Sequence, residues 1–387
     1  MKTGPSIAAL FAGIGGIEEG LRAAGGHTKL TCEVWEPAQA VLAARFPGAE
    51  HVQDIRDLDA LPEVDLVTAG FPCTDLSQAG RTAGIGGAAS GLVSNVFRLL
   101  KHQRMPLLLL ENVRNMLVLD RGEAMRYLTT ELEVLGYRWA YRLVDSRFTG
   151  VPQRRQRVIF VASLDLDPCT ILFADESGEP AEFEAEAKPC GFYWTEGRRG
   201  LGWAVDAVPT LKGGSGLGIP SPPAIWNPEA ELGRRLVTVS IEEAEQLQGF
   251  PPGWTEPAEQ ISSRKGTRWK LVGNAVTTGV ARWVGMRISD PGHALVPTEL
   301  LTSQSKWPKS ACGENGSIWK VDASMWPIHQ KRIGLGKVVD LAAAPPLSGR
   351  ATSGFLSRAE ESTLRFKEGF LRDVAEHNAF MEDLRAA

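Results

Sequence analysis

The stretch SIAALFAGIGGIEEGLRAAG, residues 6–25, decides the fold. It begins with an apolar run at 6–11, which predicts a buried strand, and it ends with a helical pattern at 16–25. The glycines between the two permit a tight turn and let the backbone approach a ligand closely. A strand, a glycine turn and a helix in this order predict the first unit of a doubly wound α/β sheet.

The same alternation continues through residue 163. Further buried strands are predicted from apolar runs at 29–35, 64–70, 106–113 and 158–163. Helices are predicted from the patterns at 37–46, 91–102 and 122–136. Strands that are apolar throughout indicate a mostly parallel sheet with helices on both faces. We therefore expect a Rossmann-like α/β domain whose ligands bind beyond the carboxyl ends of its strands.

The rest of the chain differs in composition. Proline, glycine and tryptophan are concentrated at 191–228, which predicts a smaller domain of short strands and long loops. Capping-box patterns predict a helix at 240–250 and a terminal helix that starts at Ser357, after a linker-like stretch at 341–354. The predicted domains are a catalytic domain at 1–163 completed by 273–289, a loop-rich domain at 164–272 and a C-terminal extension at 290–387.

The composition of the chain excludes several classes of protein. Its 387 residues carry a net charge of −4, and its five cysteines fit neither a disulfide framework nor a CxxC metal site. No apolar run reaches the ~18 residues of a membrane span. We expect a cytoplasmic, monomeric protein without a bound metal. Two basic stretches without acids, 146–163 and 261–289, are either solvated faces or the walls of a phosphate-binding cleft.

Residues at the ends of the first three predicted strands suit an adenosyl-type ligand. FAGIGG (11–16) lacks the third spaced glycine of the dinucleotide fingerprint, which argues against a nicotinamide cofactor. Glu33, after the second strand, can hydrogen-bond a ribose diol. Asp54 and Ile55, after the third, can read the amine of an adenine and cover its ring. The alternative is that the turn and the two acids have only structural roles.

Cys73 lies in GFPCTDLSQAG (70–80), after a proline at the end of an apolar run. A free cysteine is most often a small buried hydrophobe. On a loop at the ligand-binding edge of a sheet, the same thiol can act as a nucleophile. The other motifs of the chain are needed to choose between these two interpretations.

Five motifs occur in a specific order: FAGIGG at 11, GFPC at 70, ENV at 111, QRRQR at 153 and GNAV at 273. With this set, the chain resembles the cytosine-5 DNA methyltransferases, which use S-adenosylmethionine. The resemblance implies that the loop-rich domain is a target-recognition domain and that the substrate is double-stranded DNA. It also implies a modification enzyme of a restriction-modification or phage system, with a cognate restriction endonuclease as its functional partner.

The chemistry of the reaction gives each motif a reason. Cytosine C5 is a weak nucleophile, and addition of a thiolate to C6 makes the ring electron-rich at C5. The resemblance assigns this attack to Cys73, the acid at N3 to Glu111 and the contact to O2 to Arg157. It assigns to Arg155 the positioning of Glu111 or of the backbone. Because the reacting base must leave the duplex stack, the resemblance also implies base flipping.

The strand-end positions, the cations of the long insert at 194–216 and the resemblance together give two sets of predicted binding residues. The predicted cofactor-binding residues are Phe11, Gly13, Gly15, Gly16, Glu33, Val34, Trp35, Asp54, Ile55, Pro72, Leu92 and Asn274. Asn274 is open to a second interpretation, as a turn or cap residue. The predicted DNA-binding residues are Ser77, Arg81, Gln153, Arg198, Arg199 and Lys212. The first two fall in the glycine-rich stretch 77–91, which is either a lid over a flipped nucleotide or an ordinary surface loop.

The chain departs from the family pattern after the cysteine. Thr74 and Leu76 stand where the family usually has glutamine and phenylalanine, and Asp75 adds a carboxylate near the thiol. Two other functions stay open: a tRNA cytosine-5 methyltransferase on the same fold, and a non-catalytic DNA-binding homologue. The long insert at 194–216 favours DNA over tRNA, and the presence of both the cysteine and the glutamate favours an enzyme.

Overall fold

The computed structural model describes residues 4–71, 91–181, 188–198, 200–213, 220–302 and 305–386. The chain forms two compact units. The first comprises Met1–Thr149, Gln156–Pro180 and Ala275–Gln330, and the second comprises Gly150–Arg155, Ala181–Asn274 and Lys331–Ala387. Each unit therefore draws on three separated segments of the chain.

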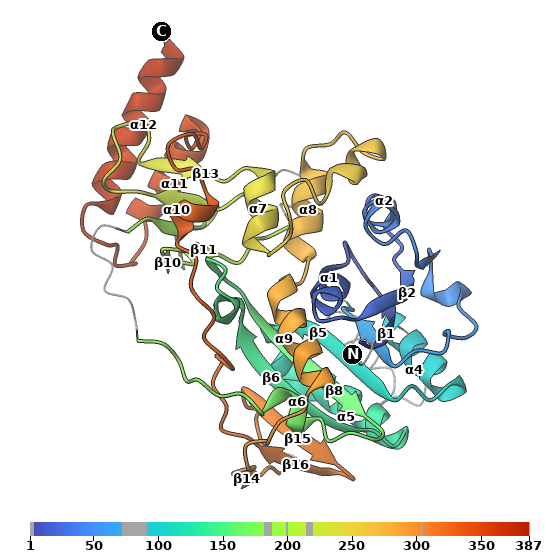
Figure 1. Cartoon of the computed structure of the whole chain (residues 1–387). Helices are drawn as coiled ribbons and strands as arrows, with labels where there is room; N and C mark the ends of the chain where they lie inside the picture. Colours follow the sequence, from blue (N-terminus) through green and yellow to red (C-terminus); the bar gives the residue numbers. More distant parts are fainter. Residues whose placement is uncertain are drawn as a thin grey trace. The chain divides into compact units, whose positions relative to one another are not determined.

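A ten-stranded sheet runs through the first unit, in the order β14-β16-β15-β6-β8-β5-β4-β1-β2-β3 (Figure 1). Its strands are β1 (Ser6–Leu10), β2 (His27–Cys32), β3 (Glu50–Val52), β4 (Leu66–Ala69), β5 (Leu107–Val113), β6 (Arg138–Asp145), β8 (Gln156–Ser163), β14 (Glu299–Leu300), β15 (Ser310–Glu314) and β16 (Ser317–Lys320). The neighbours β3, β2, β1, β4 and β5 pair in parallel, whereas the pairings from β5 outward to β14 are antiparallel. Seven of these ten described strands still run in one direction, which confirms the mostly parallel sheet of the predicted Rossmann-like α/β fold.

The first four residues of β5, Leu107–Leu110, show why these segments contain continuous apolar runs. Leu108 and Leu110 lie in one hydrophobic core, whereas Leu107 and Leu109 lie in a second core. Alternate residues of a strand point to opposite faces, so a strand that is covered on both sides is apolar at every position. Full burial of each leucine side chain contributes about 1.5–3 kcal/mol to folding.

Helices cover both faces of this sheet. The helices of the first unit are α1 (Gly16–Ala23), α2 (Glu36–Arg45), α4 (Leu92–His102), α5 (Glu123–Val134), α6 (Cys169–Leu172) and α9 (Thr278–Ser289), with the 3-10 turns η1 (Ile55–Asp57), η2 (Arg114–Leu117), η3 (Leu119–Gly122) and η4 (Ser146–Thr149). α1 and α9 contribute to the core around Leu107, and α4 and α5 contribute to the core around Leu108. α1 and α9 lie side by side (Figure 1), and a Cβ on Gly20 would lie 2.2 Å from the carbonyl oxygen of Thr278. The close approach of these two helices therefore requires glycine, and the sheet is doubly wound as predicted.

The second unit is built on a small antiparallel sheet, in the order β10-β9-β12-β13. Its strands are β9 (Cys190–Phe192), β10 (Ala204–Val205), β12 (Ala224–Trp226) and β13 (Leu236–Thr238), and a separate parallel pair is formed by β7 (Gln153–Arg154) and β11 (Val208–Pro209). Its helices are α7 (Ile241–Leu247), η5 (Glu256–Gln260), α8 (Gly266–Asn274), α10 (Leu335–Val338), α11 (Gly349–Glu360) and α12 (Phe370–Ala386). The ring centroid of Phe192 lies 5.2 Å from that of Phe355 and 5.1 Å from that of Phe370, so the sheet and the last two helices share an aromatic core.

The predicted C-terminal extension at 290–387 is not a separate part of the molecule. Its first half adds β15 to the large sheet through antiparallel pairing with β6. Its second half belongs to the second unit, where Phe355 and Phe370 are completely buried. The composition suggested a separate segment because the stretch lacks regular periodicity. Its few apolar residues are instead buried against strands that lie far away in the sequence.

The end of the chain forms two helices rather than one. α11 begins directly after Ser348, whose side chain caps it. The predicted terminal helix start at Ser357 is therefore wrong, because this residue lies in the last turn of α11. Complete burial of Phe355 extends the helix back into the linker-like stretch, and α12 begins anew at Phe370.

Candidate active site

The predicted site residues of the first unit gather at one edge of the large sheet. The chain continues from β1 to β2 and β3 on one side, and then to β4 and β5 on the other. The strand order therefore reverses between β1 and β4, and such sheets bind ligands at this point, beyond the carboxyl ends of the strands. The turn at 11–16 follows β1 at this edge, the stretch at 33–35 follows β2, and Glu111 lies near the end of β5.

The turn after β1 has an unusual backbone. Phe11, Gly13 and Gly15 have positive φ angles of 54°, 56° and 79°. A Cβ on Gly15 would lie 2.3 Å from a ring carbon of Phe46, so this position accepts only glycine. A Cβ on Gly13 would meet nothing within 4 Å, so the glycine leaves open space beside the turn. Gly16 begins α1 and is buried.

Glu33 joins this turn to the end of β2. One of its carboxylate oxygens accepts a hydrogen bond from the Gly13 N–H at 2.9 Å, and the other accepts one from the Trp35 N–H at 2.9 Å. The side chain of Gln39 donates to the Glu33 carbonyl at 2.6 Å. These bonds hold the carboxylate at the strand edge, and each oxygen has a second lone pair that can accept a ligand hydroxyl.

Val34 and Trp35 differ in exposure. The Val34 side chain is 59% exposed, whereas Trp35 is half-buried and directly precedes α2. Val34 therefore presents an apolar surface to solvent beside the Glu33 carboxylate. This exposure is the property expected of a side chain that covers a ligand ring.

A local ion pair holds the stretch after β3. The Asp54 carboxylate accepts a hydrogen bond from the Arg56 N–H at 2.9 Å and pairs with the Arg56 guanidinium at 2.5 Å. These hydrogen bonds lower the pKa of Asp54 to about 2, so the residue is an anion at neutral pH. Ile55 is only 3% exposed and Leu92 is half-buried, and both pack in the core below this edge. The contact of Ile55 with an adenine stays a prediction.

Glu111 and Arg157 form an ion pair on neighbouring strands. The antiparallel register of β5 and β8 sets Arg157 opposite Val113, which lies on the same face as Glu111. Arg157 Nε lies 2.7 Å from Glu111 Oε1, and the two side chains are 13% and 11% exposed. A Cβ on Gly70, at the end of β4, would lie 3.8 Å from the other oxygen of Glu111. An acid and a guanidinium are thus held beside the point where the chain leaves β4.

Asn112 fixes the chain at the same point. Its amide Nδ2 donates to the carbonyl of Phe71 at 3.0 Å, and its Oδ1 accepts a hydrogen bond from the Val113 N–H at 2.9 Å. Asn112 was not among the predicted site residues, although it belongs to the ENV motif. The available signal was an amide in an apolar strand, because a buried amide must find hydrogen-bond partners.

The side chains of Arg155 and Gln153 form hydrogen bonds with backbone groups of the second unit. The buried Arg155 guanidinium donates to the carbonyls of Leu211 and Gly273, both at 3.2 Å. The Gln153 amide nitrogen donates to the Leu247 carbonyl at 2.9 Å, and its oxygen accepts a hydrogen bond from the Leu211 N–H at 3.0 Å. Arg155 thus holds backbone, which is one of the two roles predicted for it. The predicted DNA contact of Gln153 is corrected, because its amide is completely buried and is used inside the protein.

Two predicted DNA contacts of the second unit lie beside acids. Arg198 pairs with Glu361 at 2.5 Å, and both side chains are exposed. Lys212 pairs with Glu196, and its Nζ lies 3.7 Å from the ring centroid of Tyr193. Exposed ion pairs contribute at most about 1 kcal/mol, so a phosphate can displace these carboxylates.

The remaining predicted site residues have no described place at this edge. Asn274 is the last residue of α8 and is exposed. The others lie outside the described residues: Pro72, Cys73, Ser77, Arg81 and Arg199.

Two further features are absent from the described part of the chain. No group of three or more His, Cys, Asp or Glu side chains there could hold a metal ion. None of the described helices is long and apolar enough to cross a membrane.

The reversal of strand order, the glycine turn and the acid–guanidinium pair have the architecture of an α/β domain of the class that binds ligands beyond its strand ends. The C-5 cytosine-specific DNA methylase family matches residues 6–184. The chain is 44% identical to the Type II methyltransferase M2.BsuMI of Bacillus subtilis (strain 168), over 95% of this chain and 97% of that protein. It is 36% identical to the Type II methyltransferase M.BanI of Aneurinibacillus aneurinilyticus, over 41% of this chain and 38% of that protein.

A solved structure, that of the S. pombe Dnmt2 methyltransferase, shares the fold, with a TM-score of 0.53 and 16% identity. The match covers 74% of this chain and 99% of that chain. The chain therefore belongs to the C-5 cytosine-specific DNA methylases and is a type II DNA (cytosine-5)-methyltransferase.

Proposed function

We propose that the enzyme transfers the methyl group of S-adenosylmethionine to C5 of a flipped cytosine in a specific duplex DNA site, through a covalent bond between Cys73 and C6. The observation that carries this proposal is the Glu111–Arg157 ion pair. The pair lies beside Gly70 at the end of β4, three residues before Cys73 in the chain. An acid and a guanidinium side by side match the adjacent N3 and O2 atoms of a cytosine.

Three side chains of the enzyme each act on a different atom of the cytosine base. The Cys73 thiolate adds to C6, and electron density moves toward C5, N3 and O2. Glu111 holds a proton at N3 and Arg157 donates to O2, so both stabilise the charge that develops as the sulfur–carbon bond forms. Once C5 carries the methyl group, loss of its proton lets the sulfur leave C6 and restores the aromatic ring.

The edge of the first unit fits S-adenosylmethionine, which supplies an electrophilic methyl group when bound. The positive φ of Gly13 and the open space where its Cβ would lie leave room for an adenosyl ligand against the turn. The Glu33 carboxylate would accept hydrogen bonds from the ribose hydroxyls. Asp54 would accept one from the adenine amine, and the exposed Val34 would cover the ring.

The part of the predicted loop-rich domain (164–272) that belongs to the second unit, residues 181–272, is proposed to read the DNA site. Its support is the short strands of the second unit and the exposed cations Arg198 and Lys212 in the loops between them. Cations of this kind contact phosphates or base edges in duplex DNA. The modified site would be the one cut by a cognate restriction endonuclease, in a bacterial or phage system.

A labelling experiment tests this function. Purified enzyme is incubated with isotope-labelled S-adenosylmethionine and either bacterial genomic DNA or bulk tRNA, and the label is located by nucleoside analysis. We expect 5-methylcytosine in DNA, none in tRNA, and no labelling with the Cys73→Ser variant. Labelled tRNA without labelled DNA would overturn the choice of substrate. Full activity of Cys73→Ser would overturn the mechanism. Bisulfite sequencing of the product then gives the recognised site.

A further inference from the structure

A cavity of about 420 Å³ opens at the far side of the large sheet, opposite to the candidate active site. β6 runs in the same direction as β5. The cavity is lined by Arg138 and Trp139, which are the first two residues of β6. It therefore lies at the edge where the parallel strands begin rather than where they end. Trp319 of β16 forms another part of the wall.

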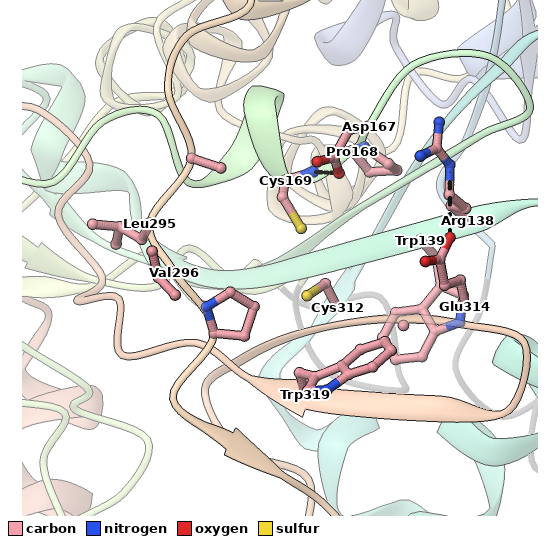
Figure 2. Close-up of a pocket in the computed structure, with 13 residues that line it drawn as sticks. Arg138, Trp139, Asp167, Pro168, Cys169, Leu295, Val296, Cys312, Glu314 and Trp319 are labelled. Atoms are coloured by element: carbon pink, nitrogen blue, oxygen red, sulfur yellow. Dashed lines mark hydrogen bonds and ion pairs between the residues drawn. The ribbon is translucent and has the colours of Figure 1, made fainter.

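Two cysteines from different elements face each other in this cavity. Cys169 is the first residue of α6, and Cys312 lies in the middle of β15, opposite Ala140 of β6. Figure 2 shows both side chains at the cavity, with the Cys169 sulfur directed toward Cys312. Both side chains line the cavity and pack in the same apolar cluster, and neither is in a disulfide. Cys169 is partly exposed, so a small solute can reach the pair from the cavity.

The two thiols also differ in acidity. The hydrogen bond between them lowers the pKa of Cys312 and raises the pKa of Cys169. The Asp167 carboxylate at the mouth of the cavity opposes ionisation of both thiols, and its Oδ1 accepts a hydrogen bond from the Cys169 N–H at 2.9 Å. A thiol of lowered pKa beside a second thiol of raised pKa is an arrangement in which one sulfur reacts first and the other resolves it.

We propose that Cys169 and Cys312 form a modification site, a dithiol that hydroperoxides oxidise to a disulfide and that thiol reductants restore. The Cys312 thiolate attacks one oxygen of hydrogen peroxide, the O–O bond breaks, and a sulfenic acid and hydroxide form. The Cys169 sulfur then attacks the Cys312 sulfur, so the S–S bond forms, the S–O bond breaks and a second hydroxide leaves. The two thiol protons convert the hydroxides to water, and two electrons pass from the sulfurs to the peroxide.

The disulfide would join parts of the first unit that are distant in the chain. Cys169 and Cys312 are 143 positions apart (312 − 169), so the bond closes a long loop and restricts the unfolded chain strongly. It would tie β15, which the C-terminal half of the sequence adds to the sheet, to α6 after β8. The site is separate from Cys73 and does not depend on the proposed catalytic mechanism.

Peptide mapping of the full-length protein tests the proposal. Wild-type enzyme and the Cys73→Ser variant are treated with hydrogen peroxide, blocked with an alkylating agent and digested without reduction. We expect a peptide pair linked through Cys169 and Cys312 in both proteins, which dithiothreitol separates. Cys32 and Cys190 are internal controls, because burial raises their thiol pKa values to about 12 and about 11, and we expect them to stay unlinked.

A second measurement follows the consequence for stability. Oxidation should raise the Tm of the wild type by about 4 °C or more, because the closed loop is long. The Cys169→Ser variant should show no such rise. Recovery of Cys169 and Cys312 as separate thiols or as sulfinic acids after complete peroxide consumption would overturn the proposal, as would a disulfide between Cys73 and either of them.

Discussion

In the described part of the chain, two glutamate–arginine pairs are largely buried, one in each unit, and they are built in opposite ways. Glu245 is completely buried, accepts hydrogen bonds from the three consecutive backbone N–H groups at 253–255, and pairs with Arg268 at 3.1 Å. Glu111 Oε1 lies 2.7 Å from Arg157 Nε. That oxygen is also buried, and no hydrogen bond of normal geometry reaches it from the described residues.

The difference is the one expected between a structural carboxylate and the carboxylate that we propose to act in the reaction. A buried carboxylate is costly unless hydrogen bonds satisfy it, and Glu245 meets this condition entirely within the protein. Among the described residues, Glu111 Oε1 has its ion pair with Arg157 but no hydrogen bond, and such incomplete sites are retained where a substrate completes them. We therefore expect loss of Glu245 to affect folding and loss of Glu111 to affect the reaction.

The largest expected effect is that of Glu111→Gln. Loss of the group that we propose to hold a proton at N3 should lower kcat by about 10²–10⁴-fold. The Tm should change little, because the removed charge was incompletely bonded. Methyl transfer at saturating DNA measures the rate, and Glu123→Gln, an exposed carboxylate of α5, is the control that should keep full activity. A large loss of Tm with an unchanged kcat would contradict the comparison.

Glu245→Gln should instead lower the stability of the protein and leave the rate of methyl transfer unchanged. Removal of the charge leaves Arg268 buried without its central partner and should cost about 3–5 kcal/mol of the free energy of unfolding. The protein that stays folded should keep its rate. Glu242→Gln is the matched control: Glu242 also pairs with Arg268, at 3.2 Å, but is 42% exposed, so its loss should cost at most about 1 kcal/mol. Urea unfolding measures both variants, and equal losses would refute the distinction.

Glu18 extends the comparison to a buried glutamate that hydrogen-bonds a hydroxyl. The Thr68 hydroxyl donates to Glu18 Oε1 at 2.6 Å, and Oε2 has no hydrogen-bond partner among the described residues. Burial raises the pKa of Glu18 from 4.5 to about 7. The folded protein therefore holds this proton more tightly than the unfolded chain does. The stability that Glu18 contributes is present below pH 4.5 and is lost as the pH rises through about 7.

Glu18→Gln should remove this pH dependence. The amide side chain of the variant keeps an oxygen that accepts the Thr68 hydroxyl and never ionises, so the variant should gain stability over the wild type as the pH rises. The gain should reach up to about 3 kcal/mol above the folded-state pKa and vanish at low pH. Chemical unfolding at a series of pH values measures it. If the difference in the free energy of unfolding between variant and wild type did not vary with pH, the pKa of Glu18 would not be raised by burial, and this prediction would be wrong.

The smallest expected effect is that of Asn112→Ala. The substitution leaves the Phe71 carbonyl without its buried donor and should lower the rate of covalent bond formation about tenfold, with an unchanged Kd for DNA. Asn115→Ala, at a neighbouring exposed position, should have no effect. Rapid-quench trapping gives the rate and equilibrium binding gives the Kd. A weaker Kd with an unchanged rate would give Asn112 a role in DNA binding instead of in positioning.

The sequence predicted those parts of the fold whose signals are local. β4 and β5 were predicted from their apolar runs, which are nearly continuous because both faces of these strands are covered. The helix at 240–250 was predicted from its capping box, and both hydrogen bonds between Ser240 and Glu243 are present. The order of the five motifs predicted the family, and the family resemblance predicted that Glu111 and Arg157 are site residues.

What the sequence did not predict depends on distant partners. β6 was missed because its arginines suggest an exposed segment. Arg142 of that strand is nevertheless completely buried, pairs with Glu176 at 2.6 Å and donates to the Leu172 carbonyl at 3.0 Å. The contact between Glu111 and Arg157 was likewise not foreseen, because it follows from the register of two antiparallel strands.

The most direct test of the proposed mechanism is covalent trapping on 5-fluorocytosine DNA. Fluorine at C5 cannot leave as the proton does, so an enzyme that bonds to C6 stays attached after methyl transfer. Genomic DNA copied with 5-fluoro-deoxycytidine triphosphate presents every possible site, and digestion of the trapped protein identifies the bonded residue. We predict an adduct at Cys73 that is nearly absent in Glu111→Gln and retained in the folded fraction of Glu245→Gln. No adduct, or an adduct at any other cysteine, would contradict the mechanism.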